Sequence, residues 1–259
     1  MIALPTEPKV VSRDGEYKAV FEISPLYPGY GMTIGNSLRR VLVSSLEGAA
    51  ITSVKIKGVL HEFSTIPNVV EDVIEIILNL KKVRLKVFSD EPVTLMLRAS
   101  GDKEITAADI KSTDQAEVIN KDQHIATLGG GKKSELEMEL RVERGVGYVP
   151  ADQREKEKLG VGVIALDGIF TPIKNVSFKV ENIRVGQRTD YNRALLEVET
   201  DGSILPEEAV HKAAKILVDH FAVVNNIEIP KEVIKKPATA KKSKAKAKIE
   251  TEEVVVVEE

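Results

Sequence analysis

The sequence predicts an α+β protein in which antiparallel, half-buried strands combine with a few amphipathic helices. Several segments alternate apolar and polar residues as half-buried strands do, the first at residues 17–23. Two other segments, at about 34–46 and 206–224, carry apolar residues at helical spacing instead. The length of 259 residues suits one large domain or two interleaved ones, with enough interior for a sizeable core.

The most informative segment is residues 29–42, which read GYGMTIGNSLRRVL. Its glycines beside Tyr30 allow a sharp turn, after which we expect Thr33 to cap a helix. Arg39 lies at the edge of the apolar stripe of this helix, and Arg40 projects from nearly the opposite side. The helix is therefore expected to bury one face and to present a cation on another. At about 100° per residue, the stripe contains Ile34, Leu38, Val41, Leu42 and Leu46.

Strands and one short helix are expected to follow. Residues 101–133 show no regular period and predict no element, and the charged residues 152–158 predict an exposed loop. In chain order, the expected elements are a strand at 51–56, a short strand after Gly58, a helix at 70–80, strands on either side of a turn at 90–92, and strands at 135–141, 176–180 and 194–200.

The last regular element is a helix that begins at Pro206, because proline suits the first helical position. Glu207 and Glu208 then lie at the positive end of the helix dipole. Two alanines in its apolar stripe would let another helix approach closely. Taken alone, such a stripe is more typical of a core than of a subunit interface. Its members are Val210, Ala213, Ala214, Leu217, Phe221 and Val224.

Composition excludes several classes of site. Without cysteine there is no disulfide, thiolate metal site or cysteine nucleophile. With no tryptophan and 4% aromatic residues, a nucleic-acid surface built on stacked rings is not expected. Residues 231–259 hold eight lysines and six glutamates, a balance of +2 against −3 for the whole chain, which leaves −5 for the remainder. No membrane-length apolar run or leader is recognisable, so we expect a cytoplasmic chain with no membrane contact.

No pattern in the sequence predicts a catalytic, cofactor or metal site. The histidines at 61, 124, 211 and 220 lack metal-ligand spacing. The glycine-rich run at 128–133 lacks the spacing of a phosphate loop. Residues 145–147 lack the third glycine of a dinucleotide fingerprint. We therefore expect surface recognition rather than chemistry.

Several strings resemble, in order and spacing, the amino-terminal, dimer-forming region of bacterial RNA polymerase alpha subunits. The resemblance covers roughly residues 10 to 225. After the segment at 29–42, the strings are GVLHEFST at 58–65, EDVIEIILNLK at 71–81, RGVGYVPA at 144–151, VGQRTD at 185–190 and PEEA at 206–209.

This resemblance implies a two-domain layout. A dimerisation domain, an antiparallel sheet plus two helices, would be built from residues 1–47 and 167–229. A mainly-β domain at 48–166 would be inserted into it. The two helices would pack against their copies in a second subunit, with a dimer interface of Ile34, Leu38, Leu42, Leu46, Ala213, Leu217, Phe221 and Val224.

The resemblance also implies a function. The homodimer would be the platform that joins the beta and beta prime subunits of DNA-directed RNA polymerase, a nucleotidyltransferase whose magnesium site belongs to the larger subunits. This chain would carry no cofactor and would contact DNA only through the complex. The implied beta-contacting residues are Arg40 first, then Lys81, with His61, Glu62 and Arg39 as weaker candidates. The implied beta prime-contacting residues are Val43, Arg184, Gln187 and Arg188.

The end of the sequence departs from the family. Typical members continue into a second, DNA-binding domain, whereas residues 230–259 are a charged, lysine-rich segment that we expect to be disordered. It is either a self-neutralising tail or a source of weak, nonspecific DNA contact. Two alternative functions stay open at this point. One is a truncated paralogue that regulates polymerase by competing for beta, and the other is a stand-alone enzyme.

Overall fold

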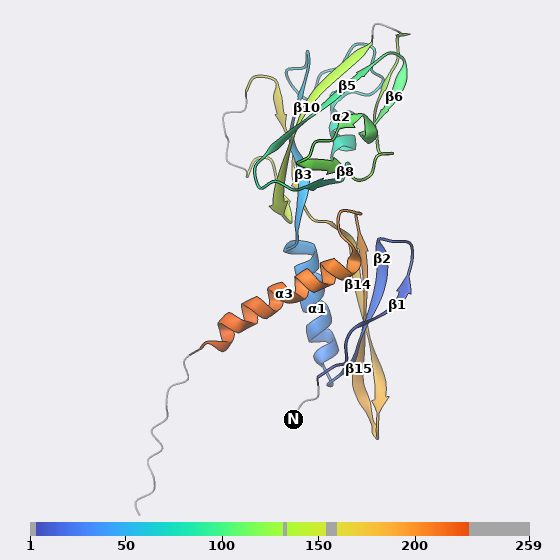
Figure 1. Cartoon of the computed structure of the whole chain (residues 1–259), viewed down its shortest axis with the longest axis vertical. Coiled ribbons are helices and arrows are strands. Elements are labelled where there is room, and N and C mark those ends of the chain that lie inside the picture. Colours follow the sequence, from blue (N-terminus) through green and yellow to red (C-terminus); the bar gives the residue numbers. More distant parts are fainter. Residues whose placement is uncertain (1–3, 132–133, 154–159, 228–259) are drawn as a thin grey trace, which may run out of the picture.

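The computed structural model describes residues 4–131, 134–153 and 160–227. It consists of two bodies along one long axis (Figure 1). The terminal domain contains both ends of the described chain, and the inserted domain contains the residues between them. Each has its own apolar core, one formed by residues between 19 and 46 and between 173 and 213, the other by residues between 51 and 166. The expected boundaries at 47/48 and 166/167 lie between these two cores.

The terminal domain is an antiparallel sheet of order β1-β2-β15-β14, covered on one face by two helices (Figure 1). The α+β class is thereby confirmed. The strands are β1 (Lys9–Arg13), β2 (Lys18–Leu26), β14 (Ile173–Val185) and β15 (Arg188–Thr200), and the helices are α1 (Tyr30–Ser44) and α3 (Pro206–Asn225). Alternate residues of the central strands face the helices, among them Phe21, Ile23, Ala194, Leu196 and Val198. The predicted strands at 176–180 and 194–200 are parts of one long hairpin formed by β14 and β15.

Helix α1 begins earlier than expected, at Tyr30, so Thr33 is not its cap. Its N-cap is Gly29, in the left-handed conformation with φ 88° and without a side chain of its own to offer. The missing acceptor comes from β15, where Asn192 Oδ1 accepts the N–H of Gly29 at 2.9 Å and that of Gly31 at 3.4 Å. A distant strand therefore caps this helix, which a local sequence pattern does not predict.

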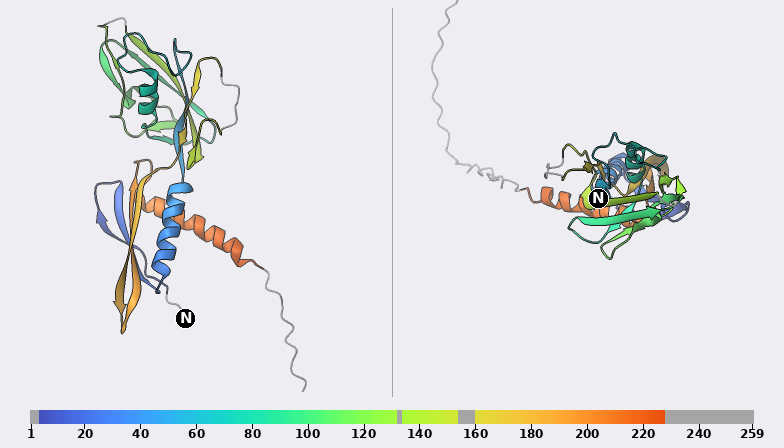
Figure 2. Two further views of the ribbon diagram at one scale, coloured as in Figure 1. Left: turned by 180° about the vertical axis from the view of Figure 1, so that it is seen from behind. Right: turned by 90° about the horizontal axis from the view of Figure 1, so that it is seen from above.

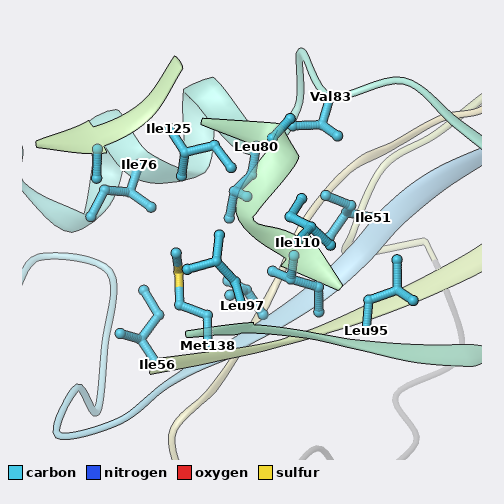
Figure 3. Packing of buried hydrophobic residues seen from close by; sticks show 14 of the residues in the cluster. Ile51, Ile56, Ile76, Leu80, Val83, Leu95, Leu97, Ile110, Ile125 and Met138 are labelled. Carbon is cyan, nitrogen blue, oxygen red and sulfur yellow. The ribbon is translucent and has the colours of Figure 1, made fainter. Parts of the chain in front are cut away.

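The inserted domain is built on a five-stranded sheet of order β12-β3-β10-β5-β7. Helix α2 (Val73–Leu80) packs on it, and Asp72 caps this helix by accepting the N–H of Glu75 at 2.7 Å. The core is aliphatic, and Figure 3 shows Ile76 and Leu80 of α2 pointing toward the residues of the sheet. The sheet strands are β3 (Glu47–Ile56), β5 (Val93–Ser100), β7 (Ile110–Lys111), β10 (Glu135–Val146) and β12 (Val163–Ala165).

Two expectations for the inserted domain were wrong. Residues 101–128 contain regular structure, because they form short strands that pair with each other or with β4 and β5. Strands this short show no readable period. The segment after Gly58 is a loop and not a strand.

The remaining elements are β4 (Leu85–Val87), β6 (Lys103–Thr106), the short 3₁₀ helix η1 (Ala107–Asp109), β8 (Ala116–Val118), β9 (His124–Leu128), β11 (Tyr148–Val149) and β13 (Gly168–Ile169).

In the described ranges, no helix is both long enough and apolar enough to cross a membrane. The predicted tail at 230–259 and most of the predicted loop at 152–158 lie outside the described residues.

Candidate assembly surfaces

Arg40 lies on the side of α1 that faces away from the sheet. Leu38 and Leu42, two residues to either side, are buried against the sheet at 6% and 0% exposure. A step of about 100° per residue therefore points the Arg40 side chain in roughly the opposite direction. It is exposed, and it forms no side-chain hydrogen bond or ion pair with another residue of the described chain. An unpaired guanidinium held on a rigid helix is suited to grip a carboxylate or carbonyl groups of a partner.

The neighbouring candidates on α1 differ from Arg40. Arg39 is engaged within the protomer, because its Nη2 donates to Asn36 Oδ1 at 3.0 Å and its guanidinium lies 5.9 Å from the centre of the Phe178 ring. Val43 is 48% exposed and is free to contact a partner. All three side chains are exposed, but only Arg39 has polar and ring contacts within the described part of the protomer.

Lys81 already has a partner. Its Nζ lies 2.7 Å from Asp167 Oδ2, and both side chains are partly buried. Asp167 Oδ1 also accepts the N–H of Ala151 at 3.0 Å. Lys81 therefore links the end of α2 to the chain that returns to the terminal domain, and its charge is less available to a partner than the sequence suggested.

His61 and Glu62 lie in the exposed loop between β3 and α2. The side chain of Ser64 supports this loop by donating to the carbonyl oxygen of His61 at 2.8 Å. Leu60 and Phe63, on either side of the pair, are also exposed, at 71% and 76%. The loop thus offers both polar and apolar groups to a partner.

The beta prime candidates other than Val43 lie at the tip of the β14–β15 hairpin, at the end of the terminal domain far from the inserted domain (Figure 1). Arg184 Nε donates to the Gly186 carbonyl at 2.9 Å, and Gln187 is exposed in the turn. Arg188 pairs with Asp190 at 2.6 Å and lies over two tyrosine rings that contact each other, so its guanidinium already has partners within the protomer. Its carbon Cζ is 5.7 Å from the Tyr27 ring centre and 5.4 Å from that of Tyr191.

The hydrogen-bonded ion pair at this tip shifts the pKa values of both of its members. Hydrogen bonding by Arg188 holds the pKa of the Asp190 carboxyl below its usual range, and the pKa of Arg188 is raised in turn. The pair is therefore ionised at neutral pH. The contact with Tyr27 also ties the hairpin tip to the connection between β2 and α1.

The apolar stripe of α3 divides into a covered half and an uncovered half. Pro206, Ala209 and Ala213 are buried in the terminal domain. Leu217, Phe221 and Val224 continue the same stripe at about 100° per residue, but Phe221 and Val224 are 63% and 57% exposed. Figure 1 shows the reason, since the second half of α3 extends beyond the sheet and α1.

This arrangement narrows the predicted dimer interface. Leu38, Leu42, Leu46 and Ala213 are buried in the protomer's own core, where no second subunit can cover them further. Ile34 and Leu217 are partly buried, and Phe221 and Val224 are exposed. The four buried residues therefore pack in the protomer core beneath the helices. The partly buried and exposed residues are the members of the predicted interface that a second subunit could reach.

The described residues contain no group of three or more His, Cys, Asp or Glu side chains arranged to hold a metal ion.

Residues 54–171 match a family model described as the RNA polymerase Rpb3/RpoA insert domain. The chain is also 53% identical over 215 residues to the DNA-directed RNA polymerase subunit alpha of Symbiobacterium thermophilum. The aligned residues are 83% of this chain and 67% of that protein.

The chain belongs to the bacterial RNA polymerase alpha subunit family.

Two further relatives agree with this assignment. The alpha subunit of Moorella thermoacetica is 55% identical over 201 residues, which are 78% of this chain and 64% of that protein. The alpha subunit of Carboxydothermus hydrogenoformans is 54% identical over 207 residues, which are 80% of this chain and 66% of that protein. The chain thus spans about two thirds of the length of these curated relatives.

Sequence reasoning missed two residues that shape these surfaces. Asn192 caps α1 from β15, and Phe170 lies where the two domains meet. The only available signals were indirect. Asn192 follows the string at 185–190. In the string at 144–151, Gly145 lies against the Phe170 ring and Gly147 accepts the N–H of Phe170.

Proposed function

We propose that this chain is the homodimeric platform on which the beta and beta prime subunits of a bacterial RNA polymerase assemble, and that it supplies no catalytic group. Its place of action is then the cytoplasm, and it contacts DNA only within the complex. The observation that carries this proposal is the uncovered apolar half of α3. Exposed apolar residues that continue a buried stripe are typical of a surface completed by a partner.

A second copy of the same helix is the partner that fits best. Two-fold symmetry brings one patch onto its own copy, and such isologous pairing is the commonest way in which subunits associate. The alanines in the covered half keep α3 close to α1, so the helices of two protomers could form one continuous apolar seam. Burial of aromatic and branched side chains there would stabilise the dimer by roughly 1.5–3 kcal/mol per residue.

The polar candidates then lie outside the seam. Each protomer of the dimer presents one Arg40 on α1, and one hairpin tip with Gln187 and Arg184 at the end of the terminal domain far from the inserted domain. Two different large subunits could each cover a different copy of these surfaces. A symmetric dimer would in this way bind two unlike partners.

The dimer can be tested by placing charges on the uncovered stripe. The double substitution Phe221→Asp and Val224→Asp leaves the protomer core intact, because both side chains are exposed. We expect it to convert the protein from dimer to monomer at micromolar concentration, since buried unpaired carboxylates oppose association. Sedimentation equilibrium measures the change directly.

The matched control is Lys215→Asp, which also adds a carboxylate to α3 but on the side opposite Ala213 and Leu217. This variant should remain dimeric. A monomeric unmodified protein, or a double variant that dimerises as tightly as the unmodified chain, would contradict the proposal.

A further inference from the structure

Both connections between the two domains pass one aromatic side chain, Phe170. The chain leaves the terminal domain at the end of α1 and enters β3 almost at once, and it returns through β13 into β14 (Figure 2). Phe170 directly follows β13 on the return segment and is only 4% exposed. Its surroundings therefore determine how the two domains meet.

Glycines from three strands leave the space that Phe170 occupies. A Cβ atom at Gly145 of β10 would lie 2.8 Å from ring atom Cδ2 of Phe170, well inside ordinary van der Waals contact. A Cβ at Gly168 of β13 would overlap the same ring, and one at Gly48 of β3 would overlap the carbonyl oxygen of Phe170. None of these glycines has a positive φ, so the requirement is for space and not for conformational freedom.

A fourth glycine extends the contact to α1. Gly147 has a φ of +67°, a conformation that favours glycine, and its carbonyl oxygen accepts the N–H of Phe170 at 2.9 Å. A Cβ at Gly147 would lie 3.2 Å from the carbonyl oxygen of Ser44, the last residue of α1. The turn after β10 thus contacts Phe170 and the end of α1 together.

The return segment is also anchored to the inserted domain just before Phe170. Asp167 pairs with Lys81 at 2.7 Å, and the N–H of Leu166 donates to the Thr52 carbonyl at 2.9 Å. Phe170 is therefore held by its own ring contacts and by an ion pair upstream. Within the protomer, Lys81 therefore anchors the return segment to the inserted domain through Asp167.

The start of α3 is separated from the inserted domain by a cleft. Glu47, Lys86 and Arg144 line the cleft from the inserted domain, and Ser203 and Glu208 line it from the terminal domain. Open space between the two leaves room for relative movement. The packing at Phe170 is one feature that limits this movement, and a second contact lies where Ile119 of the inserted domain approaches Gly202 of the terminal domain.

We propose that Phe170 and the glycines at 48, 145, 147 and 168, here called the Phe170 joint, fix the orientation of the inserted domain relative to α1. Phe170 is a positioning residue in this proposal and touches no partner itself. The joint would hold the loop with His61 and Glu62 in a constant relation to Arg40. This last step rests on the proposed function, because it matters only when one large subunit contacts both domains.

Amide hydrogen exchange of the full-length protein, read by mass spectrometry, tests the joint without any partner. Gly145→Ala should make the segment 166–172 exchange about tenfold faster, because the new Cβ displaces the Phe170 ring and opens the bond to Gly147. The matched control is Gly129→Ala, a glycine of the same domain with open space around it and no positive φ. It should exchange like the unmodified protein.

A second substitution tests whether the clash is with the ring. Leucine lacks the ring atoms that a Cβ at Gly145 would meet, so Gly145→Ala combined with Phe170→Leu should bring exchange back to within about threefold of Phe170→Leu alone. The joint is overturned by unchanged exchange in Gly145→Ala, or by equally fast exchange in the combined variant. Faster exchange spread equally over β5 and β15 in Gly145→Ala and Phe170→Leu would also overturn it, since it would indicate general unfolding.

Capture of the beta subunit by the reconstituted dimer tests the positional role. Gly145→Ala should dimerise normally and bind beta about tenfold more weakly than Gly129→Ala does. Equal binding despite a loosened joint would overturn the positional role. Failure of the unmodified dimer to bind beta would instead contradict the proposed function, and the exchange experiment would still decide the joint.

Discussion

Arg39 and Arg40 are adjacent in the sequence, but a step of about 100° directs their side chains to different environments. Arg39 is held by Asn36 and lies over the Phe178 ring. Arg40 faces away from the sheet, with no side-chain partner in the described part of the chain. The choice of Arg40 as the first candidate for binding beta therefore has a structural basis, although the contact itself stays a prediction.

Replacement of Arg40 tests this candidate. Arg40→Ala should leave dimerisation unchanged and weaken capture of the beta subunit by about 2 kcal/mol or more, as expected for a central interface anchor. Reconstitution with purified beta and titration of the complex measure the loss. Arg39→Ala is the comparison on the same helix, and we expect a smaller effect from it. Equal losses from the two variants would argue against a specific role for Arg40.

His124 joins two carboxylates of the inserted domain. Its Nε2 lies 2.9 Å from Glu71 Oε1, and its Nδ1 lies 2.8 Å from Glu104 Oε1. Burial by itself would lower the pKa of His124, but the hydrogen bonds to Glu71 and Glu104 outweigh it and raise the pKa above 6.5. Burial would likewise raise the pKa of Glu71, but hydrogen bonds from Thr127 and His124 hold it below 4.5.

These directions predict how stability depends on pH. The His124 contribution is complete below the unfolded pKa of 6.5 and is lost as pH rises through the higher folded value. The Glu71 contribution is present above 4.5 and is lost as pH falls. Relative to His124→Gln, the protein should lose on the order of 0.5 kcal/mol of unfolding free energy between pH 6 and pH 9. The figure is small because solvent screens the histidine, whose side chain is 35% exposed. Urea unfolding at each pH measures it, and parallel curves for the two proteins would contradict it.

At the scale of elements, α1 depends on the sheet for both its start and its position. Asn192 of β15 caps its first turn. Gly31 and Gly35 let the helix approach closely, since a Cβ at Gly35 would lie 2.5 Å from the Phe178 ring. The direction of Arg40 is therefore set by residues of β14 and β15 as well as by the helix itself.

Removal of the cap should destabilise the terminal domain. Asn192→Ala leaves the N–H groups of Gly29 and Gly31 without this acceptor, and we expect the free energy of unfolding to fall by about 1–2 kcal/mol. Chemical denaturation measures the change. Asn175→Ala, an exposed asparagine on β14, is the control and should be nearly neutral. Equal stability of the two variants would show that the cap contributes little.

At the scale of the whole molecule, the candidate partner-binding surfaces are distributed over both domains. The terminal domain carries the uncovered α3 stripe, Arg40 and the hairpin tip, and the inserted domain carries the loop with His61 and Glu62. The Phe170 joint connects the two where both chain crossings meet. Partners that contact both domains would depend on this connection.

Periodic patterns in the sequence were sufficient to place the main helices and the long strands. The stripe of α3, its start at Pro206 and the alternation in β10 follow from neighbouring residues alone, and the structure confirms them. The motifs at 29–42 and 144–151 likewise indicate the family by their residues and spacing alone.

Tertiary structure decided what the stripes and charges contact. The sequence offered Lys81 only as a candidate for contacting beta, but folding brings it to Asp167, a residue far away in the sequence. The sequence predicts one apolar stripe along α3, but the sheet and α1 are long enough to cover only its first half. Local sequence determines the direction of a side chain on its own element. The group that the side chain contacts belongs to a segment distant in the chain, and a local apolar or polar period carries no information about that segment.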